Sequence, residues 1–310
     1  MTLTQLEYIV AVDTHRHFAQ AAEACFVTQP TLSMQIQKLE EELDVKIFDR
    51  TKQPVIPTET GALIIAQARV ALRESNRIME LVEHQRGTMT GELRIGIIPT
   101  LAPYLLPQLF REMRARYPQL NLIIRETITE EIINELKHNR LDCGLVVTPL
   151  NDTAINEDVL FYEELFVYVS RKNALYNKRY VLAADINPNE LWLLEEGHCF
   201  RSQVLNLCEL QRRNDIQFRY ETGNIETLKR MVENTEGITI LPELAIKEFS
   251  KSQLKLVKRL QAPSPAREVS LVTHRDHIKM KHLAVLKDQI LNMVPKAMQK
   301  LQNKKIVEID

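Results

Sequence analysis

The feature that most constrains this chain of 310 residues is an alternation of short apolar runs and helical patterns from residue 91 onward. Strands that alternate with helices build a parallel sheet flanked by helices, so the sequence predicts an α/β fold. Strands are expected at 93–98, 120–126, 143–147, 160–169, 191–194, 217–221, 238–241 and 268–273, and helices at 105–116, 130–139, from 199, at 225–233 and at 281–301.

The alternation repeats after residue 169, and the run at 268–273 returns to the first unit. The sequence therefore predicts two lobes, the first made of residues 91–162 and 268–310 and the second of residues 163–267. Residues 303–310 are expected to form an unstructured tail. Ligands of such folds bind outside the carboxyl ends of strands, where Thr100 and Thr129 could orient a small polar molecule. The alternative role of these threonines is helix capping.

A cysteine stands where a helix of the second lobe should begin. Gly197 lets the backbone turn out of the apolar run 191–194, and apolar residues at helical spacing follow Cys199. Unpaired amide groups and the helix dipole favour a thiolate at such a position. His198 and Arg201 add potential positive charge and hydrogen-bond donors nearby. The pattern therefore predicts a reactive thiol.

Cys208 lies nine positions after Cys199. A thiolate can attack a peroxide O–O bond and become a sulfenic acid, which a second thiol condenses to a disulfide. Nine helical residues separate two Cα atoms by about 13 Å, whereas a disulfide requires about 4.4–6.8 Å. The bond would therefore break the helix and act as a conformational switch. The alternative is that both cysteines are inert core residues, as we expect for Cys25 and Cys143.

Composition excludes several classes of protein. The 40 basic and 41 acidic residues give no global attraction to nucleic acid, so any DNA contact must be local. Four cysteines do not form a secreted disulfide framework, and neither a signal peptide nor a membrane span is apparent. Metal-binding spacings and a phosphate-binding glycine loop are missing. We expect a soluble, cytoplasmic protein with no metal, no cofactor and no membrane partner.

Residues 1–60 have the pattern of a DNA-binding domain. Two short helical patterns, a turn at 25–27 and a third helix capped by Thr28 predict a helix-turn-helix. Leu32, Ile36, Leu39 and Leu43 should pack inward, while the opposite face is polar and can reach base edges and phosphates. The alternative is a plain three-helix packing unit. The candidate DNA-binding residues are Thr28, Gln29, Pro30, Thr31, Ser33, Met34, Gln35, Gln37, Lys38 and Arg50.

Residues 61–90 predict one long helix, because neither Pro nor Gly occurs between 62 and 86. Small and apolar residues recur about every 3.5 positions, a spacing typical of a coiled coil. We expect this helix to join two subunits; the alternative is an amphipathic helix that packs on its own chain. The seam consists of Ile64, Ala68, Ala71, Ser75, Ile78 and Val82.

The first 61 residues resemble the winged helix-turn-helix of LysR-type transcriptional regulators. The resemblance rests on Ala21-Ala22, Thr28-Gln29-Pro30-Thr31-Leu32-Ser33, Phe48-Asp49-Arg50, Thr58 and Gly61. The family usually has Arg where this chain has Gln37, and Gly where it has Asp44. The resemblance implies a wing at 55–58, a linker helix that pairs subunits, a two-lobed periplasmic-binding-protein-like effector domain, a dimer or tetramer, promoter DNA and RNA polymerase as partners, and no enzymatic role.

The effector region is similar to that of the peroxide-sensing members of this family. The matching segments are 96–100, 103–107, 141–143, 194–201 with Cys208, 226–228 and 237–242. The resemblance implies that hydrogen peroxide oxidises Cys199, that Cys208 is its disulfide partner, and that oxidative-stress genes are controlled. Residues placed around the peroxide are Thr100, Thr129, His198, Arg201 and Arg267. The alternatives are a regulator that binds a small organic anion between its lobes, and a thiol peroxidase.

Overall fold

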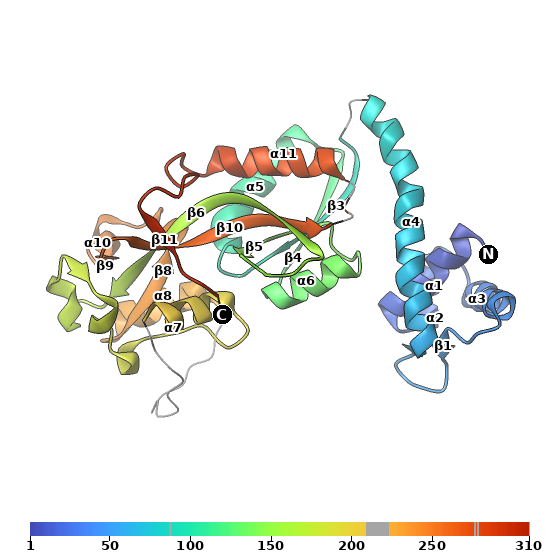
Figure 1. The fold of residues 1–310 in the computed structure, drawn as a ribbon, viewed down its shortest axis with the longest axis horizontal. Coiled ribbons are helices and arrows are strands. Elements are labelled where there is room, and N and C mark those ends of the chain that lie inside the picture. Colours follow the sequence, from blue (N-terminus) through green and yellow to red (C-terminus); the bar gives the residue numbers. More distant parts are fainter. Residues whose placement is uncertain (87–88, 209–222, 276, 278, 310) are drawn as a thin grey trace. The chain divides into compact units, whose positions relative to one another are not determined.

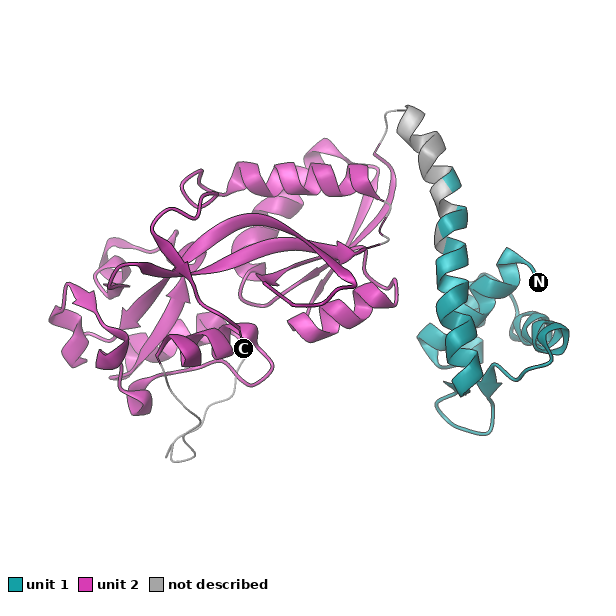
Figure 2. Cartoon of the chain, viewed as in Figure 1, with its two compact units in different colours: residues 1–88 teal, residues 89–310 magenta. Residues whose placement is uncertain are grey.

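The computed structural model describes residues 1–86, 89–208, 223–275, 277 and 279–309. They belong to two compact units, Met1–Thr88 and Met89–Asp310, which Figure 2 distinguishes by colour. Within the described ranges, no helix combines the length and hydropathy of a bilayer span. Each unit is considered by itself.

The first unit contains the predicted three helices, a short hairpin and a long helix (Figure 1). Their bounds are α1 Leu3–His15, α2 Phe18–Ala24, α3 Gln29–Leu43, β1 Phe48–Asp49, β2 Ile56–Pro57 and α4 Glu59–Arg86. The Thr28 hydroxyl caps α3 by accepting a hydrogen bond from the amide of Thr31, as predicted. Leu32, Ile36 and Leu39 are fully buried.

The expectation that Leu43 packs inward is wrong, because this side chain is 36% exposed. Leu43 is the last residue of α3, and the following Asp44 adopts a left-handed conformation with φ of 52°. The end of the helix therefore extends beyond the core that the preceding turns cover.

The long helix α4 packs its first turns on its own chain. Ile65 and Ala68 are buried in the core of the first unit, with Ile64 and Ala71 half-buried against it. These contacts agree with the alternative interpretation of an amphipathic helix. Ile78, further along the same seam, is 64% exposed, and the side chain of Val82 lies outside the described residues. Pairing of two chains through α4 stays a prediction.

The described part of the second unit contains a nine-stranded sheet with the strand order β4-β3-β5-β10-β6-β9-β7, in which β11 pairs with β10 and β8 with β6. The strands are β3 Gly91–Ile97, β4 Leu120–Glu126, β5 Cys143–Thr148, β6 Ile155–Val169, β7 Tyr180–Val181, β8 Ile238–Pro242, β9 Val257–Leu260, β10 Ser264–His274 and β11 Lys304–Ile306. The α-helices are α5 Ala102–Arg116, α6 Thr129–Lys137, α7 Cys199–Leu207, α8 Ile225–Asn234, α9 Glu243–Ile246, α10 Lys251–Leu254 and α11 Met280–Met293.

Two long antiparallel strands connect two cores, which confirms the two-lobed α/β prediction. Residues 155–164 of β6 pair with β10 beside the parallel strands β3, β4 and β5. Residues 165–169 of the same strand pair with β8 and β9. One hydrophobic core surrounds the first group and another surrounds the second. The exact residues at which one lobe gives way to the other remain predictions.

Three expected elements differ from the structure. Among the described residues, the run 191–194 forms no strand and makes one isolated bridge, between Leu191 and Ile238. The last helix ends at Met293 instead of 301, because Pro295 lacks an amide donor and disfavours a helical residue before it. The tail is not unstructured, since β11 pairs in parallel with β10. The strand expected at 217–221 lies outside the described residues.

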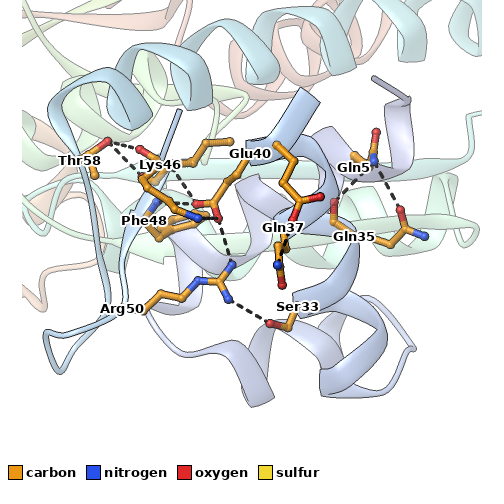
Figure 3. A network of polar contacts seen from close by, with 11 residues as sticks. Gln5, Ser33, Gln35, Gln37, Glu40, Lys46, Phe48, Arg50 and Thr58 are labelled. Carbon is orange, nitrogen blue, oxygen red and sulfur yellow. Dashed lines mark hydrogen bonds and ion pairs between the residues drawn. The ribbon is translucent and has the colours of Figure 1, made fainter. Parts of the chain in front are cut away.

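The buried carboxylate of Glu40 on α3 bonds to the segment that contains the hairpin (Figure 3). Its Oε1 atom accepts hydrogen bonds from the amides of Ile47 at 2.8 Å and Phe48 at 3.3 Å. Its Oε2 atom accepts one from Arg50 Nη2 at 3.2 Å, and Arg50 also donates to Ser33 Oγ. This carboxylate therefore fixes the third helix to the hairpin that follows it.

We predict that Glu40→Ala destabilises the first unit by about 2–4 kcal/mol, because two amides and one guanidinium lose a buried acceptor. Hydrogen exchange of residues 1–60 in the full-length protein measures this change as faster exchange in α3 and the hairpin. Glu41→Ala is the matched control, since Glu41 is exposed on the same helix. Equal exchange in both variants would contradict the role assigned to Glu40.

Candidate redox site and nucleic-acid interface

Cys199 begins α7 as the sequence predicted. Gly197 adopts φ of +92°, a left-handed conformation that glycine favours, and His198 is the N-cap. Cys199 packs against the core of the first lobe, whereas Phe200, Val204 and Cys208 are part of the core of the second. The first turn of α7 therefore lies where the two lobes meet.

A narrow hollow opens at the start of α7. It is lined by residues that follow β3, that begin α6 and that begin α7, so it lies at the carboxyl ends of two parallel strands. The hollow is too tight for a water-sized molecule unless its walls move. Its lining residues are Ile98, Thr100, Ile128, Thr129, His198, Cys199 and Phe200.

Burial raises the pKa of the Cys199 thiol above its ordinary value. The Thr129 hydroxyl, the charge of Arg267 and the amides at the start of α7 act in the opposite direction. The helix amides thus favour the thiolate as the sequence suggested, but burial outweighs them. Thr129 Oγ1 is buried and lacks a regular hydrogen-bond partner among the described residues, although it lies close enough to lower the Cys199 pKa.

Arg267, which is fully buried, connects the hollow to the long strands. Its Nη1 atom donates to Thr100 Oγ1 at 2.8 Å, and its Nη2 atom to the Thr100 carbonyl at 3.2 Å. Its Nε atom donates to Glu163 Oε2 at 2.8 Å, and Glu163 is its direct cross-strand neighbour on β6. The guanidinium also lies 5.1 Å from the ring centroid of Phe200.

His198 and Arg201 occupy different positions. The buried His198 side chain lines the hollow, with Nε2 at 3.5 Å from Glu195 Oε1. Arg201 Nη1 instead donates to the carbonyl of Leu194 at 2.8 Å, and Arg201 is not among the lining residues. Arg201 thus supports the turn before α7. Any role of either residue toward a peroxide stays a prediction.

Two residues at the junction of the lobes escaped the sequence interpretation. Glu163 is fully buried, and the only signal for it was a charged residue inside an apolar strand. The Tyr104 hydroxyl donates to Glu226 Oε1 at 2.6 Å, and its ring packs against both cores. Glu163 pairs with Arg267, and Tyr104 pairs with Glu226. The members of each pair are far apart in sequence, so only the folded structure brings them together.

Cys208 is the C-cap of α7 and is buried, which raises its pKa to about 12. All four cysteines are free thiols. The residues between Cys199 and Cys208 form a continuous helix, so their Cα atoms are separated by about 13 Å. Cys143 is confirmed as a core residue, and Cys25 packs half-buried against the core of the first unit. Burial raises the pKa of both.

The predicted DNA-reading residues gather on the outer face of α3 and beside it. Ser33 and Gln35 are half-buried: Ser33 accepts a hydrogen bond from Arg50, and Gln35 Oε1 accepts one from Gln5 at 3.4 Å (Figure 3). The remaining candidates are exposed, namely Thr28, Gln29, Pro30, Thr31, Met34, Gln37, Lys38 and Arg50. A polar, solvent-accessible helix face of this kind can enter the major groove of DNA.

We predict that Thr129→Val raises the pKa of Cys199, because the variant removes a hydroxyl that lowers it. A smaller fraction of the thiol is then ionised below the pKa, so alkylation of Cys199 by iodoacetamide becomes slower there and its pH midpoint moves upward. Peptide mass spectrometry follows the reaction at this cysteine. Thr127→Val is the control and should leave the midpoint in place; a downward shift in Thr129→Val would refute the assignment.

Comparison with known proteins agrees with this geometry. The model of the bacterial regulatory helix-turn-helix protein, lysR family, matches residues 3–62, and that of the LysR substrate binding domain matches residues 86–294. A hydrogen peroxide-inducible genes activator of Haemophilus influenzae is 36% identical over 273 residues, which cover 88% of this chain and 90% of that protein. The DNA-binding transcriptional dual regulator OxyR of Escherichia coli K12 is 38% identical over 273 residues, 88% of this chain and 89% of that protein.

Among solved structures, a full-length OxyR variant from Pseudomonas aeruginosa superimposes with a TM-score of 0.80 at 33% identity, covering 94% of each chain. The likeness thus extends over the head, the long helix and both lobes. The chain belongs to the LysR family of helix-turn-helix transcriptional regulators.

Proposed function

We propose that this chain is a DNA-binding transcriptional regulator that responds to hydrogen peroxide through Cys199. The observation that carries the proposal is the hollow in which a cysteine at a helix N-terminus faces Thr129 and lies beside Thr100 and Arg267. Similarity to proteins named as hydrogen peroxide-inducible activators supports the same assignment. Oxidation serves as a signal and not as a turnover step, so the protein acts as a regulator and not as an enzyme.

The first step is a two-electron oxidation of sulfur. Cys199 loses its proton, and the thiolate attacks one oxygen of the peroxide while the O–O bond breaks. The sulfur becomes a sulfenic acid, and the other oxygen leaves as hydroxide and takes up a proton to form water. Thr100 Oγ1 accepts a hydrogen bond from Arg267, so its own proton can point to the leaving oxygen. The Thr129 hydroxyl can donate to the same guest.

The second step joins the two cysteines. The Cys208 sulfur attacks the sulfenic sulfur of Cys199, an S–S bond forms, the S–O bond breaks, and water leaves with the proton of Cys208. A disulfide needs Cα atoms about 4.4–6.8 Å apart, so α7 must open. Because Phe200 and Val204 are buried in the second core, this opening must repack that lobe.

The signal reaches DNA through the first unit. The exposed face of α3 enters the major groove, where Gln and Thr side chains contact base edges and Lys38 and Arg50 contact phosphates. Two chains pair through the part of α4 that carries the exposed Ile78, and two such pairs form a tetramer. Repacking of the second lobe changes how these heads hold promoter DNA and how RNA polymerase is engaged.

We predict that stoichiometric peroxide removes two hydrogen atoms from the mass of the intact protein by forming one Cys199–Cys208 disulfide. Cys208→Ser should instead retain a sulfenic acid that dimedone traps at Cys199, and Cys199→Ser should leave Cys208 reduced. Intact-mass and peptide mass spectrometry report all three results. Cys25→Ser is the control and should behave as the unaltered chain; two titratable thiols at 199 and 208 after treatment would overturn the mechanism.

For the head, we predict that Lys38→Ala weakens binding to every DNA sequence and lowers the slope of log affinity against log salt by about one, as loss of one phosphate contact requires. Titration of the protein with duplexes that it selects from random-sequence DNA measures both quantities. Lys251→Ala, in the second unit, should change neither. An unaltered salt slope in Lys38→Ala would exclude the phosphate contact.

A further inference from the structure

We propose that the C-terminal tail, residues 303–309, is a strap that keeps α7 helical, and that Gln203 is the positioning residue through which the strap slows the closure of the Cys199–Cys208 bond. The proposal rests on the proposed function and concerns the rate of its second step.

The strap is anchored on β10. Its strand β11 pairs in parallel with residues 264–266, and the amide of Val307 donates to the carbonyl of Ala266 at 2.9 Å. The Val307 side chain belongs to the core of the second lobe and is only 9% exposed. Ala266 directly precedes Arg267, so the anchor is next in the chain to the residue that donates to Thr100 in the wall of the hollow.

The strap holds α7 by two side chains that both lie between the cysteines. Gln203 Nε2 donates to the Val307 carbonyl at 2.9 Å, and Asn206 Nδ2 donates to the Glu308 carbonyl at 3.3 Å. Figure 1 shows the described part of the C-terminal tail, drawn in dark red, running beside α7. Since closure of the disulfide must open the helix between its two ends, it must also withdraw both donors from the tail.

Gln203 is poorly explained as a residue that only stabilises the fold. Its side chain has no exposed surface, yet Oε1 has no hydrogen-bond partner among the described residues. A buried amide that satisfies only part of its hydrogen-bonding capacity costs more than an apolar side chain of similar size. The hydrogen bond to the Val307 carbonyl is therefore what a glutamine contributes at position 203.

The strap prolongs the lifetime of the sulfenic acid at Cys199, because it slows the second step. Opening α7 leaves the buried carbonyl of Val307 without its donor, which adds to the barrier of the second step but not to that of the first. During that interval a second peroxide can oxidise Cys199 further to a sulfinic acid. The hydrogen bonds between the tail and α7 therefore determine which fraction of the sulfenic acid becomes disulfide and which fraction becomes sulfinic acid.

The test compares both steps in the full-length protein by rapid quenching with dimedone and with an alkylating reagent, followed by mass spectrometry. Gln203→Leu should form sulfenic acid at the unaltered rate, close the disulfide about tenfold faster and yield less sulfinic acid at high peroxide. Asn206→Ala, whose side chain is exposed, should act in the same direction and serves if Gln203→Leu fails to fold. Ser202→Ala, which has no hydrogen bond to the described tail residues, should not accelerate closure.

Hydrogen exchange gives a second, independent reading. After peroxide, the amides of residues 305–307 should lose protection in the unaltered chain but keep it in Cys208→Ser. Normal sulfenic acid formation with unaltered closure in Gln203→Leu, or a tail that stays protected in the disulfide form, would overturn the strap alone. Failure of Cys199 to form sulfenic acid in any variant would overturn the proposed function itself.

Discussion

The fully buried guanidinium of Arg267 connects the elements around the candidate site. A buried guanidinium is tolerated only when it is paired and its donors are satisfied. Arg267 meets this condition through Glu163 on the neighbouring long strand, through both oxygens of Thr100 and through the face of Phe200. One side chain therefore ties β6 and β10 to the end of β3 and to the first turn of α7. A change in α7 must disturb the strands that connect the lobes.

Opposing influences act on the pKa of the Cys199 thiol at the same site. Burial raises the pKa of Cys199, while Thr129, Arg267 and the helix amides lower it, and burial is the stronger influence. In the proposed mechanism the thiol must therefore lose its proton before the sulfur can act as a nucleophile. Because the hollow is too tight for a water-sized molecule at rest, only a very small guest can enter by a modest movement of the walls. In the proposed mechanism the tightness of the hollow favours a small oxidant over larger ones.

Local signals in the sequence were enough for much of this arrangement. The cap at Thr28, the turn at Gly197 and the alternation of apolar runs are determined by neighbours in the chain, so the three helices of the head, the start of α7 and the α/β class of the second unit were predictable. The antiparallel pairing of β10 with β5 and β6 was not predicted. Glu163 and β11 were not, because each depends on a partner far away in sequence. Lys304–Ile306 is too short and too polar to be recognised as a strand, and only pairing with β10 makes it one.

The length of α7 explains why these distant contacts matter. A helix of nine residues is too short to be stable alone in water, so it persists because Phe200 and Val204 are buried in the second core and because the tail bonds to it. Its stability is thus a property of the folded lobe. Since the two thiols occupy its first position and its C-cap, the proposed disulfide cannot form while the helix between them is whole. Closure of the proposed disulfide and opening of α7 are for this reason coupled, whereas oxidation of Cys199 alone does not require α7 to open.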